Sequence, residues 1–366
     1  MFTDEDWMAR AISLAKKGEG WTSPNPLVGA VVVKDGRIIG EGFHERRGQA
    51  HAERNALTAC LEDPGGATLY VNLEPCCHYG RTPPCTEAII AAGISRVVVG
   101  SMDPNPLVAG EGIRQLRQAG IQVDVGVQHA SCSTLNQIFF HYMKVGLPYV
   151  AVKYAMTADG KIAARTGASQ WITGEEARAH VQKLRNRYRA IMVGSETVLR
   201  DNPLLTCRMP GGRNPLRVIC DRRLRIPLDS NICRTAGEVE TVVASSAPDS
   251  IKRSALEAAG ITVLDLPSRD GGVDLHALMI WLGAREIDSL LVEGGSQMLA
   301  SVLEEGLVKK LYCYLAPKLL GGTGAPSPIG GQGVSSPQEA LKLSAPQVRH
   351  FSGGDLLLEY DVEEVK

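Results

Sequence analysis

The sequence predicts an α/β protein made of two domains. The chain has 366 residues, and at roughly 150 residues per domain this length favours two. Short apolar runs alternate with amphipathic segments, the order typical of largely parallel sheets covered by helices. Gly146-Leu147-Pro148 interrupts this alternation. We therefore expect one domain at 1–146 and a second at 147–366.

The first half opens with a helix and a hairpin. Apolar residues on one face predict a helix over 4–17, which Gly18 ends. The apolar runs 27–33 and 37–43 enclose Lys34-Asp35-Gly36, a hairpin signal. The elements expected after them are helices at 51–61, 86–92 and 109–119 and strands at 67–73, 94–100 and 121–125.

The second half shows another α/β pattern, and it shares no motif with the first. The helices expected there lie at 175–187, 250–259, 274–283 and 296–305. The expected strands lie at 149–156, 190–193, 216–221, 241–245, 262–266, 288–293, 311–316 and 356–362. Residues 321–337 are rich in Gly, Pro and Ser and should form a long loop.

Composition excludes several classes of protein. Lys and Arg number 39 against 40 Asp and Glu, a net charge of −1, which argues against a general nucleic-acid binder. The chain has no run of about 18 apolar residues, so no transmembrane helix is expected. Its first residues are acidic where a signal peptide would be basic. We expect a cytoplasmic protein whose nine cysteines are thiols or metal ligands.

One group of residues has the pattern of a catalytic zinc site. His51-Ala52-Glu53 stands at a helix start, Pro75-Cys76 follows a strand, and Pro84-Cys85 stands at another helix start. One His and two Cys thiolates suit zinc, which keeps a fourth position open for water in catalytic sites. Glu53 lies two residues from His51, close enough to reach the metal-bound water without being a ligand, and could take the proton of that water and hand it to a leaving ammonia. His-x-Glu followed by Pro-Cys is the signature of zinc nucleobase deaminases.

Other residues near these three could also bind the metal. Eight residues, 77–84, separate the two cysteines, whereas the general deaminase signature has two. Cys77 is a possible ligand beside Cys76, although Cys76 is preferred because it follows Pro75. A structural zinc site, which needs four closed ligands, stays open because Cys77 or His78 could be the fourth.

Other polar residues of the first half are weaker candidates for substrate binding. Asn25 lies in a turn before the first strand and could contact a pyrimidine edge, or serve only its own turn. His44 ends the hairpin and could equally be structural. Arg81, in the long loop, would suit a substrate phosphate. Asp103-Pro104-Asn105-Pro106 follows a strand end, where α/β sites gather polar groups, but it is also ordinary turn chemistry.

The second half contains fewer motifs that indicate a function. It has neither a Rossmann fingerprint nor a P-loop. Val292-Glu293-Gly294-Gly295-Ser296 runs from a strand into a helix, and its glycines would let the backbone approach an anion. A plain strand-to-helix turn explains the segment equally well.

Taken together, these segments resemble the bifunctional deaminase–reductase family of riboflavin biosynthesis. The resemblance rests on His51-Ala52-Glu53, the segment from Leu73-Glu74-Pro75-Cys76 to Pro84-Cys85, Asp103-Pro104-Asn105-Pro106, Ser169-Gln170-Trp171-Ile172-Thr173 and Val292 to Ser296. It covers the whole chain in order, and the wide cysteine spacing is the family's own variant. Cys77 departs from the serine expected there.

The resemblance implies the fold of each half and a set of site residues. It implies a cytidine-deaminase-like three-layer α/β/α domain, with zinc on His51, Cys76 and Cys85 and Glu53 as the catalytic acid and base. For the second half it implies a dihydrofolate-reductase-like α/β domain that uses NADPH. Its cofactor residues would be Ala155, Trp171, Thr197, Asp201, Gly294, Gly295 and Ser296. Its substrate residues would be Ser169, Arg185, Leu205, Arg208 and Glu293.

The implied activity has two steps on one small phosphorylated pyrimidine. Hydrolytic deamination of 2,5-diamino-6-ribosylamino-4(3H)-pyrimidinone 5′-phosphate would come first, and NADPH reduction of its ribosyl chain to ribityl would follow. A homo-oligomer is expected. The alternative of a nucleic-acid deaminase shares the zinc motif but needs a basic surface that the balanced charge does not favour.

Overall fold

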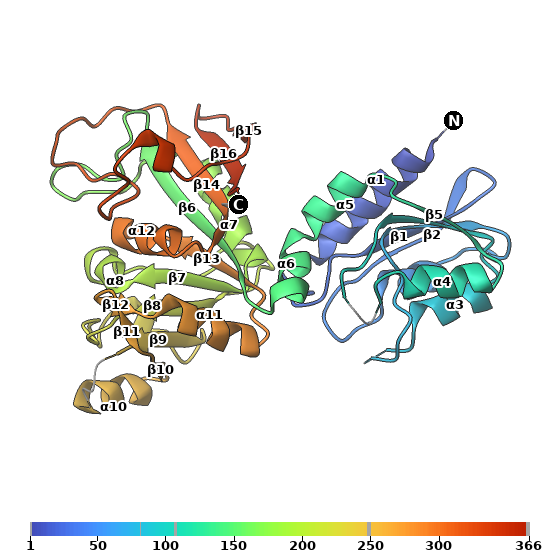
Figure 1. Cartoon of the computed structure of the whole chain (residues 1–366), viewed down its shortest axis with the longest axis horizontal. Coiled ribbons are helices and arrows are strands. Elements are labelled where there is room, and N and C mark those ends of the chain that lie inside the picture. The colour runs from blue at the N-terminus through green and yellow to red at the C-terminus, as the bar shows by residue number, and fades with distance from the viewer. Residues whose placement is uncertain (1, 81, 106–107, 247–249, 364–366) are drawn as a thin grey trace. The chain divides into compact units, whose positions relative to one another are not determined.

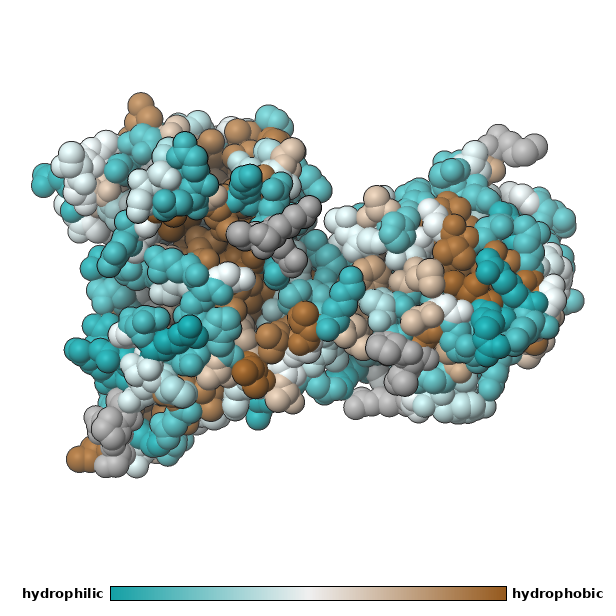
Figure 2. Space-filling model, viewed as in Figure 1, coloured by the Kyte–Doolittle hydropathy of each residue, from teal (hydrophilic) through white to brown (hydrophobic). Residues whose placement is uncertain are grey.

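The computed structural model describes the chain except residues 1, 81, 106–107, 247–249 and 364–366. The described chain folds into two compact units, Met1–Gly146 and Leu147–Lys366 (Figure 1). No helix among the described residues is long and apolar enough to cross a membrane. On the face drawn in Figure 2, hydrophilic residues cover most of each unit, and hydrophobic residues form smaller groups.

The first unit contains a five-stranded sheet in the order β2-β1-β3-β4-β5. β1 is antiparallel to both β2 and β3, whereas β3, β4 and β5 are parallel. The expected hairpin and the parallel strands after it are therefore confirmed. The strands are β1 (Gly29–Lys34), β2 (Arg37–Phe43), β3 (Thr68–Leu73), β4 (Arg96–Ser101) and β5 (Gln122–Val125).

Helices cover both faces of this sheet, so the expected three layers are present. Alternate side chains of β1 enter different cores, because successive residues of a strand point to opposite faces. Val31 packs with α1 and α5, and Val32 packs on the other face with α2, α3 and α4. The helices are α1 (Asp4–Ala15), α2 (Ala52–Thr58), α3 (Cys85–Ala91), α4 (Glu111–Gln118), α5 (His129–Leu135) and α6 (Gln137–Val145), with a short 3-10 turn at Lys16–Gly18.

Gly29 lets the first helix approach the sheet closely. A Cβ added there would strike the carbonyl oxygen of Ala11 and come within 2.7 Å of the Ala15 nitrogen. We expect Gly29→Ala to lower the free energy of unfolding by about 1–3 kcal/mol, the usual cost of overpacking. Urea unfolding measures this, with Gly237→Ala as the control because a Cβ at Gly237 would meet open space. Equal stability of the two variants would contradict the prediction.

The second unit contains a nine-stranded sheet in the order β10-β9-β8-β7-β13-β6-β14-β16-β15. The strands from β10 to β14 run parallel, and β16 and β15 add antiparallel pairs at one edge. Its strands are β6 (Tyr149–Thr157), β7 (Ala190–Gly194), β8 (Leu216–Cys220), β9 (Thr241–Ser245), β10 (Thr262–Asp265), β13 (Ser289–Glu293), β14 (Val308–Ala316), β15 (Gln347–His350) and β16 (Leu356–Asp361). A small ribbon pairs β11 (Ser268–Arg269) with β12 (Gly272–Val273).

Two cores flank this larger sheet. Met192 of β7 packs with α11 and α12, whereas its neighbour Ile191 packs with α8, α9 and α10 on the opposite face. The described helices are α7 (Glu175–Arg187), α8 (Ser195–Asp201), α9 (Asn231–Arg234), α10 (Ser250–Ala258), α11 (Leu275–Ala284) and α12 (Ser296–Glu304). The expected long loop at 321–337 is present as far as residue 336, and a 3-10 turn at Pro337–Glu339 follows it.

Candidate active sites

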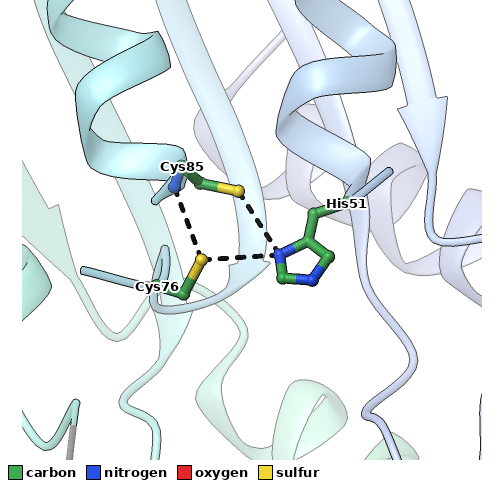
Figure 3. Close-up of side chains that lie close together, drawn as sticks. All are labelled: His51, Cys76 and Cys85. Atoms are coloured by element: carbon green, nitrogen blue, oxygen red, sulfur yellow. Dashed lines mark hydrogen bonds between the residues drawn. The ribbon is translucent and has the colours of Figure 1, made fainter. Parts of the chain in front are cut away.

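The three predicted metal ligands meet in the first unit. His51 is the N-cap of α2, Cys76 lies just after β3, and Cys85 is the first residue of α3. Their side chains point toward one another (Figure 3). The Nδ1 atom of His51 lies 3.4 Å from the Cys76 sulfur and 3.5 Å from the Cys85 sulfur.

The donor set fits a zinc ion. All three ligand atoms lie within 4.8 Å of one another, and a tetrahedral zinc ion would hold a sulfur and a nitrogen about 3.6 Å apart. The backbone N–H of Cys85 donates to the Cys76 sulfur at 3.4 Å. Contacts with the Cys85 thiol, this N–H and His51 hold the pKa of Cys76 well below its usual range, so Cys76 is prepared to act as a thiolate ligand.

Glu53 lies in the first turn of α2, beside these ligands and outside their set. Its side chain is buried, and its Oε2 atom has no hydrogen-bond partner among the described residues. Burial raises the pKa of Glu53 to about 7. An unpartnered buried carboxylate oxygen is costly unless a group that is bound during function satisfies it. Next to a three-ligand metal site, a water molecule is such a group.

Cys77 and His78 do not join the ligand group. Among the described residues the clustered donors are His51, Cys76 and Cys85 alone. Three ligands with one open position are the arrangement of catalytic zinc rather than of structural zinc. The geometry thus favours Cys76 over Cys77 and a reaction over a purely structural role.

Asn25 and His44 lie together beside the metal ligands. The Nδ1 atom of His44 lies 3.1 Å from the carbonyl oxygen of Ala50, so Nδ1 carries the proton. Its Nε2 atom then accepts from the side-chain amide of Asn25 at 3.1 Å. Burial lowers the pKa of His44 and keeps the ring neutral. The His44 ring packs edge-on against His51, with 5.3 Å between centroids.

The turn that carries Asn25 is held by two asparagines that the sequence analysis did not single out. Asn136 accepts from the Leu27 N–H at 2.8 Å, and Asn72 donates to the Leu27 carbonyl at 2.9 Å. Both asparagines are buried. Nothing in the sequence pairs them with residue 27, because 45 and 109 positions separate the partners.

Of the other candidates in the first half, the structure describes Asp103 but not Arg81. Asp103 is buried after β4, and its Oδ1 atom accepts from the backbone N–H of Asn105 at 2.8 Å. Arg81 lies outside the described residues. Thr82, which the sequence analysis did not name, approaches the metal ligand from the long loop, with its hydroxyl 3.5 Å from Nε2 of His51.

In the second unit, Glu293 and Arg185 form a buried ion pair. Glu293 ends β13, and both of its oxygens accept from Arg185, at 2.8 and 2.9 Å. Lys153 of the adjacent β6 donates to the same carboxylate at 3.2 Å, because the strand register sets Lys153 opposite Glu293. Burial opposes ionisation of Glu293, but the charges of Arg185 and Lys153 outweigh it and lower its pKa to about 2.

The loop that carries Leu205 and the turn at Gly294 and Gly295 lie next to the Glu293–Arg185 pair. Arg185 also donates to the carbonyl of Thr206, at 3.0 Å, and so holds the loop that carries buried Leu205. Gly294 and Gly295 follow Glu293 with positive φ angles of 86° and 81°. A Cβ on Gly295 would lie 3.3 Å from the Thr197 hydroxyl, so the starts of α12 and α8 are neighbours.

The remaining second-half candidates are side chains that the structure leaves accessible. Trp171 is 60% exposed, and the Arg178 guanidinium lies 4.5 Å from its ring centroid. Ala155 is half-buried in β6, opposite Tyr314 of β14. Ser169 and Ser296 are half-buried, and Asp201 and Arg208 are exposed.

Family models match both units. The model described as the cytidine and deoxycytidylate deaminase zinc-binding region matches residues 1–101, and the RibD C-terminal domain model matches residues 148–357. The first match contains the clustered ligands His51, Cys76 and Cys85, and the second contains Lys153, Arg185 and Glu293.

Known proteins resemble the chain over most of its length. A curated riboflavin biosynthesis protein RibD from Actinobacillus pleuropneumoniae is 56% identical over 88% of this chain and 86% of its own length. The Escherichia coli RibD is 44% identical over 87% of this chain and 89% of its own.

Solved structures extend the similarity to the fold. A diaminohydroxyphosphoribosylaminopyrimidine deaminase/5-amino-6-(5-phosphoribosylamino)uracil reductase from Thermotoga maritima is 40% identical, covers 98% of both chains and has a TM-score of 0.87. The Acinetobacter baumannii RibD is 38% identical over 99% of both chains, also with a TM-score of 0.87. The chain therefore belongs to the RibD family, the bifunctional deaminases and reductases of riboflavin biosynthesis that use zinc and NADPH.

Proposed function

We propose that the first unit deaminates 2,5-diamino-6-ribosylamino-4(3H)-pyrimidinone 5′-phosphate. The second unit then reduces the ribosyl side chain of the product and gives 5-amino-6-ribitylamino-uracil 5′-phosphate. The observation that carries the proposal is the three-ligand metal site with the unpartnered Glu53 oxygen beside it. The substrates named for the Thermotoga maritima protein support the choice of molecule.

In the first step, water replaces the ring amino group. His51, Cys76 and Cys85 would hold zinc, which lowers the pKa of a bound water to about 7. Glu53 would accept a proton of the attacking water through Oε2, which has no hydrogen-bond partner among the described residues, and would pass it to the departing nitrogen. A carbon–oxygen bond forms, the carbon–nitrogen bond breaks, and ammonia leaves.

Asn25, His44 and Arg81 are proposed to bind the substrate of this step. Since His44 uses both ring nitrogens within the protein, its proposed effect passes through Asn25, whose amide it orients. The side-chain oxygen of Asn25 is then available for a donor on the pyrimidine ring. Arg81 is proposed to bind the phosphate from the long loop.

Removing the Asn25 side chain should weaken substrate binding. We expect Asn25→Ala to raise the KM of deamination about tenfold, the usual effect of losing one hydrogen bond to a buried polar group. Steady-state ammonia release measures this, and reduction of the deaminated substrate by the same variant is the internal control. An unchanged KM would remove Asn25 from the substrate site.

In the second step, bound NADPH would supply a hydride to C1 of the ribosyl group in its ring-opened imine form, and a proton from solvent would complete the amine. Ala155, Trp171, Thr197, Asp201 and the segment Gly294–Ser296 are proposed to line the cofactor site. The positive φ angles of the two glycines bring backbone N–H groups to the start of α12, where the helix favours a phosphate.

The ribosyl phosphate is proposed to lie against Ser169, Arg185, Leu205, Arg208 and Glu293. Glu293 and Arg185 neutralise one another, so the pair presents a fixed polar surface rather than a net charge. Lys153 donates one N–H to Glu293 and keeps two others for the reacting sugar. Arg208, which is exposed, is free to turn toward the phosphate.

Mass spectrometry of the products tests the proposal. Without NADPH, the substrate should exchange one amino group for oxygen and change no further. With NADPH added, the product should gain two hydrogens. Recovery of unchanged substrate from the zinc-loaded chain would refute the deaminase proposal, and a deaminated product that gains no hydrogen would refute the reductase proposal.

We also propose that the chain forms a homo-oligomer, because enzymes of this size commonly associate. Sedimentation equilibrium measures its mass. A monomer at micromolar concentration would contradict this expectation.

A further inference from the structure

Glu74 is a buried acid that the two reactions leave without a role. It follows β3 directly and stands two residues before the metal ligand Cys76. Its side chain is 3% exposed. No ion pair joins it to a basic side chain of the described residues. A buried carboxylate without a cation must be stabilised by hydrogen-bond donors.

Three backbone N–H groups supply that stabilisation. Oε2 of Glu74 accepts from Asp103 at 3.2 Å and from Gly110 at 3.0 Å, and Oε1 accepts from Ile113 at 3.2 Å. One oxygen atom thus holds both ends of the segment 103–110.

The same carboxylate caps a helix from a distance. Gly110 is the N-cap of α4, with a φ of 90° and no side chain that could accept from the first turn. The first N–H groups of a helix need acceptors, and the positive end of the helix favours an anion. Glu74 therefore provides from β3 what an Asp or Ser at position 110 would provide locally.

These bonds place Asp103 and the N-terminal end of α4 against the chain that carries the zinc ligand. A Cβ on Gly112 would strike the carbonyl oxygen of Pro75, the residue before Cys76. Burial is the main cause that raises the pKa of Asp103 to about 6, and the charges of Glu74 and then Cys76 add to it. Asp103 and the start of α4 therefore lie against the chain that leads to the metal ligand.

We propose that Glu74 is a positioning residue of the deaminase, which fixes residues 103–105 and the N-terminal end of α4 as a wall of the pyrimidine pocket relative to the zinc ligand Cys76. The proposal rests on the deaminase function assigned above. It differs from a ligand or proton-transfer role, because Glu74 acts on the backbone of the wall and not on zinc or substrate.

Glu74→Gln tests this inference. An amide nitrogen in place of Oε2 would face the N–H groups of Asp103 and Gly110, and in place of Oε1 it would face that of Ile113. Either orientation sets donor against donor. We expect kcat/KM for deamination to fall at least about tenfold, mostly through KM, while the zinc content and the reduction of the deaminated substrate stay unchanged. Hydrogen exchange of the amides at 103, 110 and 113 should accelerate.

The matched control is Glu111→Gln. Glu111 is an acid in the first turn of the same helix, and its side chain bonds Arg114 and Gln115 instead of the segment 103–110. This change removes the same charge near the same helix end, so deamination should keep its wild-type KM. Glu74→Asp keeps the charge on a shorter arm and should restore part of the lost affinity.

The outcomes separate the inference from its rivals. An unchanged KM in Glu74→Gln would overturn it. Loss of zinc with a parallel fall in kcat would also overturn it, because Glu74 would then act on Cys76 and not on the wall. If Glu74→Gln does not fold, the KM of deamination and the zinc content are measured on Glu74→Asp instead. An unchanged KM or a loss of zinc in that variant would again overturn the inference. A wild-type chain that releases no ammonia would instead refute the proposed function.

Discussion

Glu53→Gln should abolish ammonia release and leave zinc bound. The amide cannot accept a proton from water or return it to the leaving nitrogen, and general acid–base catalysis contributes roughly 10²–10⁴ in rate. Zinc should stay because His51, Cys76 and Cys85 form the ligand cluster without Glu53. Ammonia release measures the first effect and metal analysis of the purified variant measures the second.

The second unit of the same chain provides the control for this variant. Reduction of the deaminated substrate should proceed at the wild-type rate, because Glu53 lies in the first compact unit and the Glu293 group lies in the second. Deamination at the wild-type rate would remove Glu53 from the mechanism. Loss of zinc would show instead that Glu53 is needed to form the site.

Arg185→Ala should abolish reduction and spare deamination. Without Arg185, the buried Glu293 keeps Lys153 as its one ion-pair partner among the described residues. The carbonyl of Thr206 also loses its donor, so the loop carrying Leu205 is no longer held. Removal of one partner from a buried ion pair typically costs about 3–5 kcal/mol. We expect at least a hundredfold loss of NADPH oxidation and a lower unfolding temperature of the second unit.

Two further variants separate catalysis from stability. Lys183→Ala changes an exposed cation two positions earlier on α7, and it should leave reduction unchanged. The double change of Arg185→Ala with Glu293→Gln removes the buried carboxylate that has lost one of its two cationic partners, so it should recover part of the stability without recovering activity. Recovery of reduction in the double variant would show that the ion pair serves stability alone.

The zinc site was predictable because its chemistry is local. A His-x-Glu helix start and two Pro-Cys segments are a specific combination of residue types for a zinc site. Each segment lies at a helix start or after a strand that the local sequence predicts. Long periodic elements were also predictable: α7 spans Glu175–Arg187, as the sequence indicates. The short helices α5, α6, α8 and α9 were missed, and each has nine residues or fewer, too few turns for a clear apolar period.

The second site depends on strand register, which the sequence does not reveal. Lys153 meets Glu293 because β6 and β13 are adjacent although 140 positions separate the residues. The sequence alone indicates no role for Lys153, and the family resemblance alone suggests one for Arg185 and Glu293. Glu74 was missed for the same reason, since its three partners lie 29 to 39 positions away.

A single coupled assay tests most directly whether this chain performs both reactions in order. The zinc-loaded protein is given the diaminopyrimidine substrate and NADPH, and ammonia and NADPH are followed together. We predict that ammonia appears first and does not require NADPH, and that one NADPH is then consumed for each ammonia after a lag. NADPH consumption without prior ammonia release, or ammonia release that NADPH consumption never follows, would contradict the assignment.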